Sequence, residues 1–305
     1  MAVYAPIYYR EFRCVAGDCK HTCCAGWQID IDADTVDRYR GMEGAIGEEI
    51  RASLLPHEGG VHFATVKNGR CAHLDEEGLC RIIRAVGEEA LCHICREHPR
   101  FYHTVAGDTL VGLGAVCETA AALLLTAPDY ITLVSTDAAL PQALLTDAAF
   151  CAHAALFEAL KNGEGAFDAR VAAIKERFAG SLCLPPREWR RLFASLEYLD
   201  KKNKKRFQKA LRRVARAKDL LQQQEPLRER FLAYLFYRHV LSAKDAHDAR
   251  LAVGVALTML TVFEALLLQG VSPAEAARTV SEELEYSEEN TEAIFFALDL
   301  QALGA

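Results

Sequence analysis

The chain has 305 residues, of which 51% are apolar and 25% are charged, and its formal net charge is −7. This length predicts two domains, or one large domain with an appendage. The composition excludes intrinsic disorder and a collagen-like fold. The negative charge argues against a general nucleic-acid-binding protein, because phosphate groups require an excess of positive charge.

Cysteine is the unusual component of this sequence. There are 11 cysteines, and nine of them lie between Cys14 and Cys117. The N-terminal residues lack the basic head, apolar run and small-residue cleavage site of a secretory signal, so we expect a cytoplasmic protein. In a reducing compartment, clustered thiols are metal ligands or redox groups more often than disulfides. Cys151 and Cys183 stand apart and are interpreted as small buried apolar residues.

The clustered cysteines form two groups that predict metal binding. The groups are Cys14-x4-Cys19-x3-Cys23-Cys24 and Cys71-x8-Cys80-x11-Cys92-x2-Cys95. The Cys92-x2-Cys95 spacing allows two thiolates to converge on one metal from a turn. Cys23 and Cys24 are adjacent, so we expect their side chains to diverge and not to bind one small tetrahedral ion together. The spacing allows two four-cysteine zinc sites or an iron–sulfur cluster with cysteines to spare, and does not choose between them.

Within the first 118 residues, a few short elements can be predicted. Residues 28–31 alternate between polar and apolar, which is typical of a short strand. Asp32 or Asp34 then provides an N-cap for a helix through residues 36–39. The acids of residues 30–34 resemble the start of a calcium loop, but the required glycine and glutamate are missing, so they are interpreted as a helix cap with solvated acids.

The remainder of the chain has helical patterns. Residues 119–126 predict a buried helix that ends before Pro128, and Pro185-Pro186 predicts a joint because prolines break helices. Residues 251–268 carry only one charge, Glu264, and are interpreted as a buried core helix, with a membrane span as the alternative. The segment that begins at Ser272 has the N-cap, first-turn proline and N3 glutamate of a capping box.

Residues 201–218 contain ten basic residues and no acidic one. Phe207, Leu211 and Val214 recur at helical spacing, which predicts a basic helix with a narrow apolar stripe. Without these ten charges the rest of the chain is near −17 (−7 minus 10), so charge is strongly segregated. The basic surface is interpreted either as a solvated helix face or as a docking surface for an acidic partner.

Taken together, the residues predict a mainly α fold. We expect a cysteine-rich, metal-binding domain with little strand over residues 1–118, followed by an α-helical domain over residues 119–305 that includes the basic helix.

Two segments also carry a resemblance to a known family. They are FRCVAGDCKHTCCAGWQIDID, which starts at Phe12, and CAHLDEEGLCRIIRAVGEEALCHICREHPRFY, which starts at Cys71. Together they resemble the flagellin lysine-N-methylase family, and the cysteine-rich part is similar to a small iron- or zinc-chelating domain of bacterial proteins. The resemblance is dense over about the first 120 residues and continues loosely through residues 234–239 and 284–290.

The resemblance implies an enzyme that transfers methyl groups from S-adenosylmethionine to lysines of flagellin. It also implies a cysteine-bound iron–sulfur cluster, of the 4Fe-4S type, with zinc as the alternative. The metal ligands that it implies are Cys14, Cys19, Cys23, Cys24, Cys71, Cys80, Cys92 and Cys95.

Independent motifs for this chemistry are sparse. Residues 111–117 contain Gly-x-Gly but lack a third glycine, and are interpreted as a turn at a helix start. A C-x3-C-x2-C radical-cluster motif is absent, because Gly26 stands where its third cysteine belongs. Arg238 and His239 close an apolar run and are interpreted either as exposed residues at a helix end or as a buried charged pair that would need partners. His93, His98 and His103 surround the second cysteine group and are interpreted as structural hydrogen-bonding residues.

Two other hypotheses compete with the methyltransferase. In the first, a non-enzymatic iron- or zinc-binding module docks a partner through its helical region. In the second, the cluster serves electron transfer. No membrane partner and no nucleic acid is expected.

Overall fold

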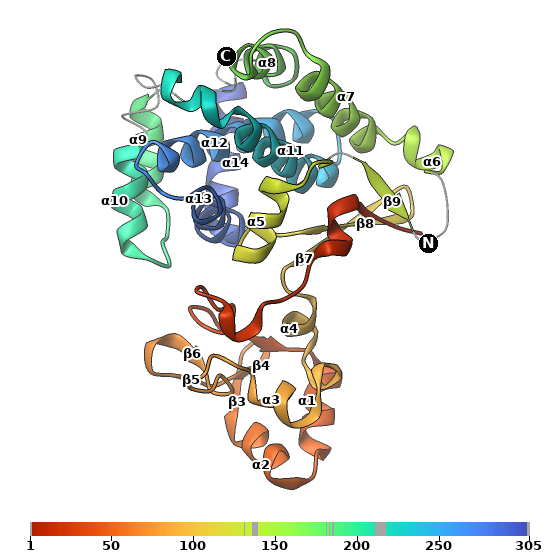
Figure 1. Ribbon diagram of the computed structural model, residues 1–305, viewed down its shortest axis with the longest axis vertical. Coiled ribbons are helices and arrows are strands. Elements are labelled where there is room, and N and C mark those ends of the chain that lie inside the picture. Colours follow the sequence, from red (N-terminus) through yellow and green to blue (C-terminus); the bar gives the residue numbers. More distant parts are fainter. Residues whose placement is uncertain are drawn as a thin grey trace. The chain divides into compact units, whose positions relative to one another are not determined.

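The computed structural model describes residues 2–130, 132–135, 140–180, 182, 184, 186–210 and 218–303. The chain divides into two compact units (Figure 1). The cysteine-rich unit comprises Arg13–Arg100, and the helical unit comprises Met1–Phe12 together with Phe101–Ala305. Helices account for most of the described residues, so the predicted mainly α class is confirmed.

The structure divides the chain differently from the boundary predicted at residue 118. Strand β1 (Val3–Pro6) pairs in parallel with β8 (Asp108–Leu113), and the Thr109 N–H donates to the Ala2 carbonyl at 3.0 Å. These hydrogen bonds tie the N-terminal segment to residues beyond 100. In the order of the chain, the cysteine-rich unit is therefore an insertion between the two segments that form the helical unit.

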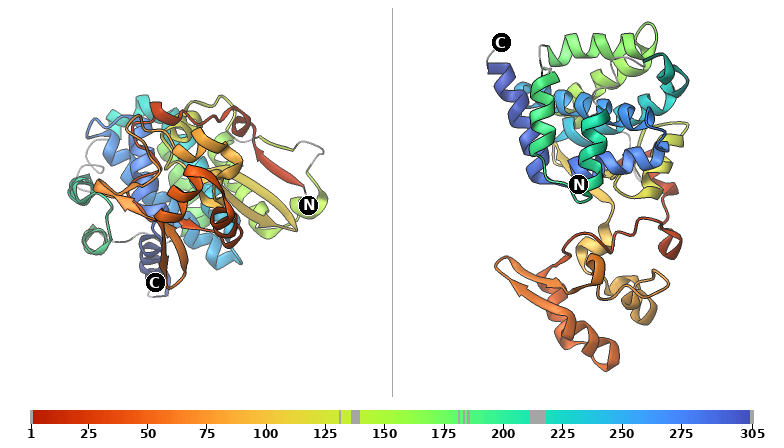
Figure 2. Two further views of the ribbon diagram at one scale, coloured as in Figure 1. Left: turned by 90° about the horizontal axis from the view of Figure 1, so that it is seen from below. Right: turned by 90° about the vertical axis from the view of Figure 1, so that its left-hand side faces the viewer.

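The cysteine-rich unit combines short strands with short helices. Its strands are β2 (Asp30–Ile31), β3 (Leu54–His57), β4 (Gly60–Phe63), β5 (Thr65–Val66) and β6 (Arg70–Cys71), and its helices are α1 (Ala33–Gly41), α2 (Gly44–Ser53), α3 (Arg81–Val86) and α4 (His93–Glu97). The antiparallel sheet has the order β2-β4-β3, and β5 pairs with β6. Helix α1 packs against α2 and β4, and these elements can be followed in the right-hand view of Figure 2.

The predicted strand and helix start in this unit are confirmed. The strand is shorter than expected, because only Asp30 and Ile31 pair with β4. Asp32 is the N-cap of α1, and its carboxylate accepts a hydrogen bond from the Thr35 N–H at 3.0 Å. Such a cap satisfies one of the amide groups that have no partner within the helix.

The core of the cysteine-rich unit includes two of the cysteines. Tyr39, Ile50 and Ile82 are fully buried, and Cys71 and Cys92 belong to the same cluster of buried side chains. A thiol at such a position is a small apolar group when it is protonated. The two sulfurs are therefore shielded from water by the core itself.

The helical unit contains a four-stranded sheet. β7 (Arg100–Val105) and β9 (Leu133–Ser135) complete it, in the order β7-β8-β1-β9. Ala106 and Gly107 form the β7–β8 turn with φ of 50° and 84°, as a tight hairpin turn of type I′ requires. Gly112 lies against the Phe101 ring, and a Cβ there would approach Phe101 Cζ to 2.2 Å. Residues 111–113 are thus strand, and the predicted helix-start turn is limited to residues 114–117, directly before the helix that begins at Glu118.

Ten helices form the rest of the described helical unit. They are α5 (Glu118–Thr126), α6 (Gln142–Leu145), α7 (Ala148–Asn162), α8 (Phe167–Ile174), α9 (Pro186–Ser195), α10 (Lys201–Ala210), α11 (Glu225–His239), α12 (Ala246–Leu267), α13 (Pro273–Val280) and α14 (Glu288–Leu303). α11 and α12 lie side by side, and α5, α7, α10, α13 and α14 pack around them (Figure 1). Two π-helical segments, Lys175–Ala179 and Ser281–Glu285, continue α8 and α13.

Helix α12 is the core helix that residues 251–268 predict. It is long and apolar enough to cross a membrane, but 83% of its most apolar window is buried within the protein. The single charge of residues 251–268, Glu264, is 9% exposed and pairs with Arg228 of α11, whose guanidinium also pairs with Asp168 of α8 at 2.6 Å. A buried carboxylate is stable only with such a partner.

Other predictions for the helical unit are confirmed in part. Helix α5 covers the predicted residues 119–126, and α9 begins at Pro186, whereas Pro185 lies outside the described residues. Helix α13 begins after the predicted N-cap Ser272, but the Ser272 side chain makes no capping hydrogen bond. Glu275, the N3 residue, pairs with Arg278 at 3.1 Å.

The basic segment is described only in its first part. α10 covers residues 201–210, with Phe207 buried and Lys201, Lys202 and Lys205 exposed, as the predicted apolar stripe requires. Leu211 and Val214, which continue the predicted stripe, lie outside the described residues.

Candidate functional site

The cysteines of the second group are held by short, well-connected elements. Cys71 ends β6, Cys80 is the N-cap of α3, and Cys92 is the N-cap of α4, whose first turn carries Cys95. The loop between Cys71 and Cys80 is closed by Asp75, whose carboxylate accepts hydrogen bonds from the Glu77 and Leu79 N–H groups. Secondary structure and the Asp75 hydrogen bonds therefore hold the backbone next to these four thiols.

The first cysteine group is joined to the second through β6. The Cys71 N–H donates to the Cys24 carbonyl at 2.7 Å, and the Gly26 N–H donates to the Gly69 carbonyl at 3.1 Å. The indole N–H of Trp27 donates to the Cys23 carbonyl at 2.8 Å. These bonds place the Cys23-Cys24 turn beside the strand that carries Cys71.

The structure gathers six sulfurs in this region. Cys92 and Cys95 are hydrogen-bonded to each other through their side chains, as are Cys23 and Cys24. The thiols that interact electrostatically with one another are Cys24, Cys71, Cys80, Cys92 and Cys95. The expectation that the side chains of Cys23 and Cys24 diverge is therefore wrong, because they lie in a turn that brings their sulfurs together.

The thiols influence one another's ionisation strongly. Burial, reinforced by Cys24, Cys80 and Cys92, raises the pKa of the Cys71 thiol to about 11. The hydrogen bond from Cys23 lowers the pKa of the Cys24 thiol to about 7, although burial opposes this shift. Similarly, the bond between Cys92 and Cys95 lowers the pKa of Cys92 and raises that of Cys95. Several thiolates cannot coexist here unless a cation compensates their charge.

The remaining cysteines occupy different surroundings. Cys14 is exposed and accepts a hydrogen bond from the Ala16 N–H, and the Cys19 thiol donates to the His21 carbonyl. Both stay predicted ligands that these contacts do not test. Cys117 is the N-cap of α5 in the helical unit, and Cys151 is exposed, not buried as the sequence predicts. Cys183 lies outside the described residues.

The gathered cysteines fit a metal group that thiolates bind. Four thiolates hold either one zinc ion or one iron–sulfur cluster, and the region offers six sulfurs within a partly buried core. Both groups take four thiolates, so this donor set suits either one.

The three histidines predicted near the second cysteine group are separated by the structure. The His93 N–H donates to the Asp32 carboxylate at 2.8 Å, and the His98 ring packs against Trp27 with ring centroids 6.0 Å apart. Burial lowers the pKa of His98 to about 4, so this ring is neutral near pH 7. His103 lies in β7 of the helical unit and does not belong to the cysteine-rich unit.

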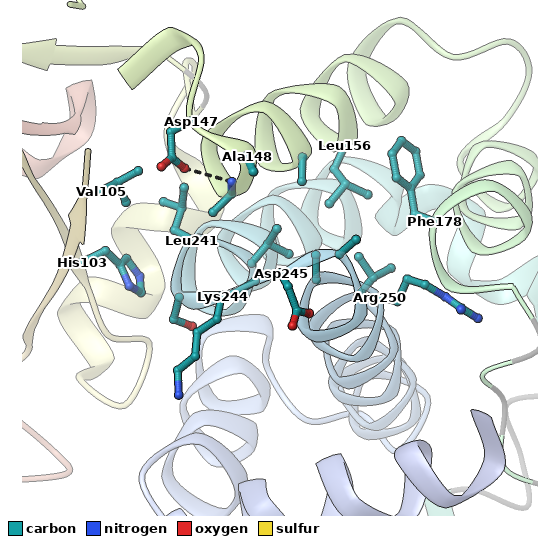
Figure 3. A pocket seen from close by; sticks show the side chains of 18 of the residues that line it. His103, Val105, Asp147, Ala148, Leu156, Phe178, Leu241, Lys244, Asp245 and Arg250 are labelled. Atoms are coloured by element: carbon teal, nitrogen blue, oxygen red, sulfur yellow. Dashed lines mark hydrogen bonds between the residues drawn. The ribbon is translucent and has the colours of Figure 1, made fainter. Parts of the chain in front are cut away.

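The helical unit contains a cavity of about 710 Å³. It lies between β7, the starts of α7 and α12, and the π-helical segment Lys175–Ala179. Figure 3 shows His103 on one side of the cavity and Phe178 with Arg250 on the other. Asp147 and Asp245 are the N-caps of α7 and α12. Sequence reasoning missed this cavity, because its walls come from segments far apart in the chain.

His103 provides a polar group in the cavity wall. Its Nε2 is buried and has no hydrogen-bond partner among the described residues. Burial, followed by the charges of Arg238 and His239, lowers the pKa of His103 to about 4. The ring is therefore neutral near pH 7 and offers a nitrogen that can accept or donate one hydrogen bond.

Arg238 and His239 are partly buried, and both lie beside the carboxylate of Glu285. The side chain of Glu285 is fully buried and accepts hydrogen bonds from Tyr234 Oη at 2.7 Å and His239 Nε2 at 3.0 Å. Burial opposes the ionisation of Glu285, but His239 and Arg238 hold its pKa below the ordinary value. The Arg238 guanidinium also lies over the Phe101 ring, 4.2 Å from its centroid. This network joins α11, the π-helical segment Ser281–Glu285 and strand β7 of the four-stranded sheet.

Comparisons with known proteins identify relatives of this chain. It is similar to the flagellar biosynthetic protein FliU of Salmonella muenchen, with 30% identity over 139 residues that cover 44% of this chain and 82% of FliU. Lysine-N-methylases of Salmonella typhimurium (strain LT2) and Salmonella choleraesuis (strain SC-B67) are also 30% identical over 139 residues.

The extent of these matches differs between the relatives. The matched segment spans about a third (35%) of each lysine-N-methylase. No protein-family model and no solved structure matches the chain. Because the match covers most of FliU at 30% identity, the chain belongs to the flagellin lysine-N-methylase family.

Proposed function

We propose that this protein transfers methyl groups from S-adenosylmethionine to lysine side chains of flagellin, and that its cysteine-rich unit holds an iron–sulfur cluster. The observation that carries the proposal is the match to relatives named FliU and lysine-N-methylase, which spans 82% of FliU. The gathered cysteines supply the donor set for the cluster. The proposal places the protein in the cytoplasm, where such thiols stay reduced.

The proposed reaction sets clear demands on the site. The lone pair of the lysine Nζ forms a bond to the methyl carbon, the bond from that carbon to sulfur breaks, and S-adenosylhomocysteine leaves. The proton of the lysine ammonium group must be lost, because only the neutral amine is a nucleophile. A desolvating pocket lowers the pKa of a lysine and so favours the neutral amine.

The cavity of the helical unit is our candidate for the place of this reaction. Its volume of about 710 Å³ is within the range of pockets that bind small molecules. Leu156, Phe178 and Val253 form an apolar part of its wall, and an amine that lies against this part would be desolvated. His103 is neutral, so it adds no positive charge that would repel the sulfonium group of the methyl donor.

The cysteine-rich unit would hold the cluster through four of its six gathered sulfurs. Cys71, Cys80, Cys92 and Cys95 come from three successive elements, and Cys24 is a further donor beside Cys71. When bound, an iron–sulfur cluster supplies a redox-active centre and cross-links the loops that carry its ligands. Zinc is the alternative group, and it would leave the unit without redox activity.

The test is methyl transfer from S-adenosylmethionine labelled in its methyl group. The full chain, purified without oxygen, is incubated with several purified flagellins, and label in the flagellin is measured after denaturing electrophoresis. We expect label in at least one flagellin, and none when flagellin lysines have been acetylated beforehand. Label that persists on acetylated flagellin would contradict lysine methylation.

The non-enzymatic binding module is the second candidate function. It is favoured by the fact that the matched segment spans only 35% of the lysine-N-methylases, which leaves much of those proteins without a counterpart in it. The same assay separates the two candidates. If no flagellin is labelled while the protein carries its metal and still binds flagellin, the module replaces the enzyme. An electron-transfer protein would show neither labelling nor flagellin binding.

A further inference from the structure

One face of the β2-β4-β3 sheet brings together two histidines and one aspartate. In the antiparallel register, Asp30 of β2 lies opposite His62 of β4, and His62 lies opposite Leu55 of β3. Residues directly opposite each other share a face, as do residues two apart on one strand. His57, two residues after Leu55, is therefore on the same face as Asp30 and His62.

The side chains of these three residues converge. One ligand atom from each of Asp30, His57 and His62 lies within 4.8 Å of the other two. The distance from His57 Nε2 to Asp30 Oδ1 is 3.3 Å, and the two imidazole rings have centroids 5.3 Å apart. Nitrogen and oxygen ligands of a tetrahedral zinc ion, each 2.0–2.1 Å from the metal, are about 3.4 Å from one another. One edge of such a site already has this length.

The surroundings of the three side chains also favour a bound cation. His62 Nδ1 is buried and has no hydrogen-bond partner among the described residues, which is unfavourable for a polar atom that has lost its contact with water. The Gln28 side-chain amide donates to Asp30 Oδ1 at 2.9 Å and so orients the carboxylate. A hydrogen bond of this kind to a ligand is a regular feature of metal sites.

Binding requires one small rearrangement at His57. Its Nδ1 accepts a hydrogen bond from the Gly59 N–H at 3.2 Å, so the proton of the neutral ring is on Nε2. A metal at Nε2 would move this proton to Nδ1 and end the bond to Gly59. Both residues are exposed, so water can replace the lost partner.

We propose that Asp30, His57 and His62 form a second metal site that binds a divalent zinc ion independently of the cysteines. Two imidazoles and one carboxylate are ligands typical of zinc sites that keep an open position. Asp30 and His57 are exposed, so the fourth position is accessible to water or to a donor atom of a binding partner. The cysteines offer only sulfur, which binds iron–sulfur clusters and also zinc, so the two sites differ in the chemistry of their ligand atoms.

Cobalt(II) is a suitable probe for this site, because its absorption spectrum distinguishes thiolate from nitrogen and oxygen ligands. The full chain, purified without oxygen and with its cysteine site as isolated, is titrated with Co²⁺ while visible absorption and bound cobalt are measured. We expect one equivalent of cobalt with d–d bands and no added thiolate-to-cobalt charge transfer. We also expect that Zn²⁺ displaces it.

Three variants make the test specific. In His57→Ala/His62→Ala we expect the affinity for Co²⁺ to fall by more than about 100-fold, beyond the 10- to 100-fold range of changes outside the ligand shell. Gln28→Ala should weaken binding within that range. His247→Ala removes an exposed histidine of the helical unit and should bind Co²⁺ like the unchanged protein.

Three results would overturn the proposal. The first is a cobalt spectrum dominated by thiolate charge transfer, which would assign the bound ion to the cysteines. The second is unchanged affinity in the double histidine variant, and the third is no cobalt binding in the unchanged protein. Asp30→Asn, which preserves the shape of the side chain, guards against misfolding of the double variant. It must also lose affinity, while its far-ultraviolet circular dichroism stays unchanged.

Discussion

Replacing Arg228 by methionine tests the ion pairs that anchor the core helix. Arg228 is 2% exposed, and its guanidinium pairs with Glu264 of α12 and Asp168 of α8. Methionine removes the guanidinium that pairs with the Glu264 carboxylate, whose side chain is 9% exposed. Removing one partner of a buried ion pair costs about 3–5 kcal/mol, because the other charge stays buried and loses that Coulombic attraction.

The double variant Arg228→Met/Glu264→Leu separates this penalty from the loss of the pair itself. Replacing both charges with apolar groups should recover most of the stability, since buried ion pairs contribute little net free energy. Asp168 is 35% exposed and can be solvated. We therefore expect a coupling free energy of at least about 2 kcal/mol between the two positions.

The assay is urea unfolding of the full chain, followed by far-ultraviolet circular dichroism. Arg40→Met, which removes an exposed pair with Asp37, is the control and should leave the unfolding midpoint nearly unchanged. The reasoning would be refuted if Arg228→Met unfolded at the same urea concentration as the unchanged protein. A double variant less stable than the single variant would refute it as well.

Three further predictions follow from the described contacts. Asp32→Ala removes the N-cap of α1 and the acceptor of the His93 N–H, so urea unfolding of the cysteine-rich unit should show a loss of about 1–2 kcal/mol; an unchanged midpoint would disprove the cap. Burial, with a smaller effect of His103, lowers the pKa of His153 to about 3. The unfolded chain therefore takes up a proton at His153 near pH 6.5 and the folded chain does not, so the stability that is complete above pH 6.5 is lost as the pH falls toward about 3. In His153→Leu, the free energy of unfolding measured across this pH range should fall less. An identical pH profile in the two proteins would refute the assignment to His153. Ala152→Phe narrows the cavity of the helical unit, so equilibrium dialysis should show at least about tenfold weaker S-adenosylmethionine binding, whereas equal binding would place the donor elsewhere.

Local signals in the sequence predict the elements that depend on neighbouring residues. The N-cap Asp32 gives the start of α1, and the apolar composition of residues 251–268 gives the buried core helix α12. Both follow from contacts within a few residues of each other. The clustering of the cysteines is also visible in the composition and spacing, and metal binding by these thiols stays a prediction.

Features that depend on distant pairing could not be predicted. The boundary between the units is set by β1 and β8, which are about a hundred residues apart in the chain. Gly112 resembles part of a phosphate-binding loop, yet it is glycine because the Phe101 ring lies against it. Likewise, His57 and Asp30 carry no shared motif, and only the strand register brings them together.

The charge network of the helical unit shows the same limit. Arg238 and His239 are adjacent in the sequence, so a need for partners could be predicted. The partner, Glu285, lies in a π-helical segment and its side chain is fully buried. A glutamate in the acidic run of residues 282–285 is expected to be solvated, so its burial is visible only in the structure.

The gathered cysteines of this chain are proposed to hold an iron–sulfur cluster, and the chain belongs to the flagellin lysine-N-methylase family. The most direct test is the visible spectrum, with iron, zinc and acid-labile sulfide measured on the same anaerobically purified sample. We predict a brown protein with matching iron and sulfide, which the variant Cys71→Ser/Cys92→Ser loses and Cys151→Ser, an exposed cysteine of the helical unit, retains. A colourless protein whose thiols bind zinc, or a cluster that survives in the double variant, would contradict it.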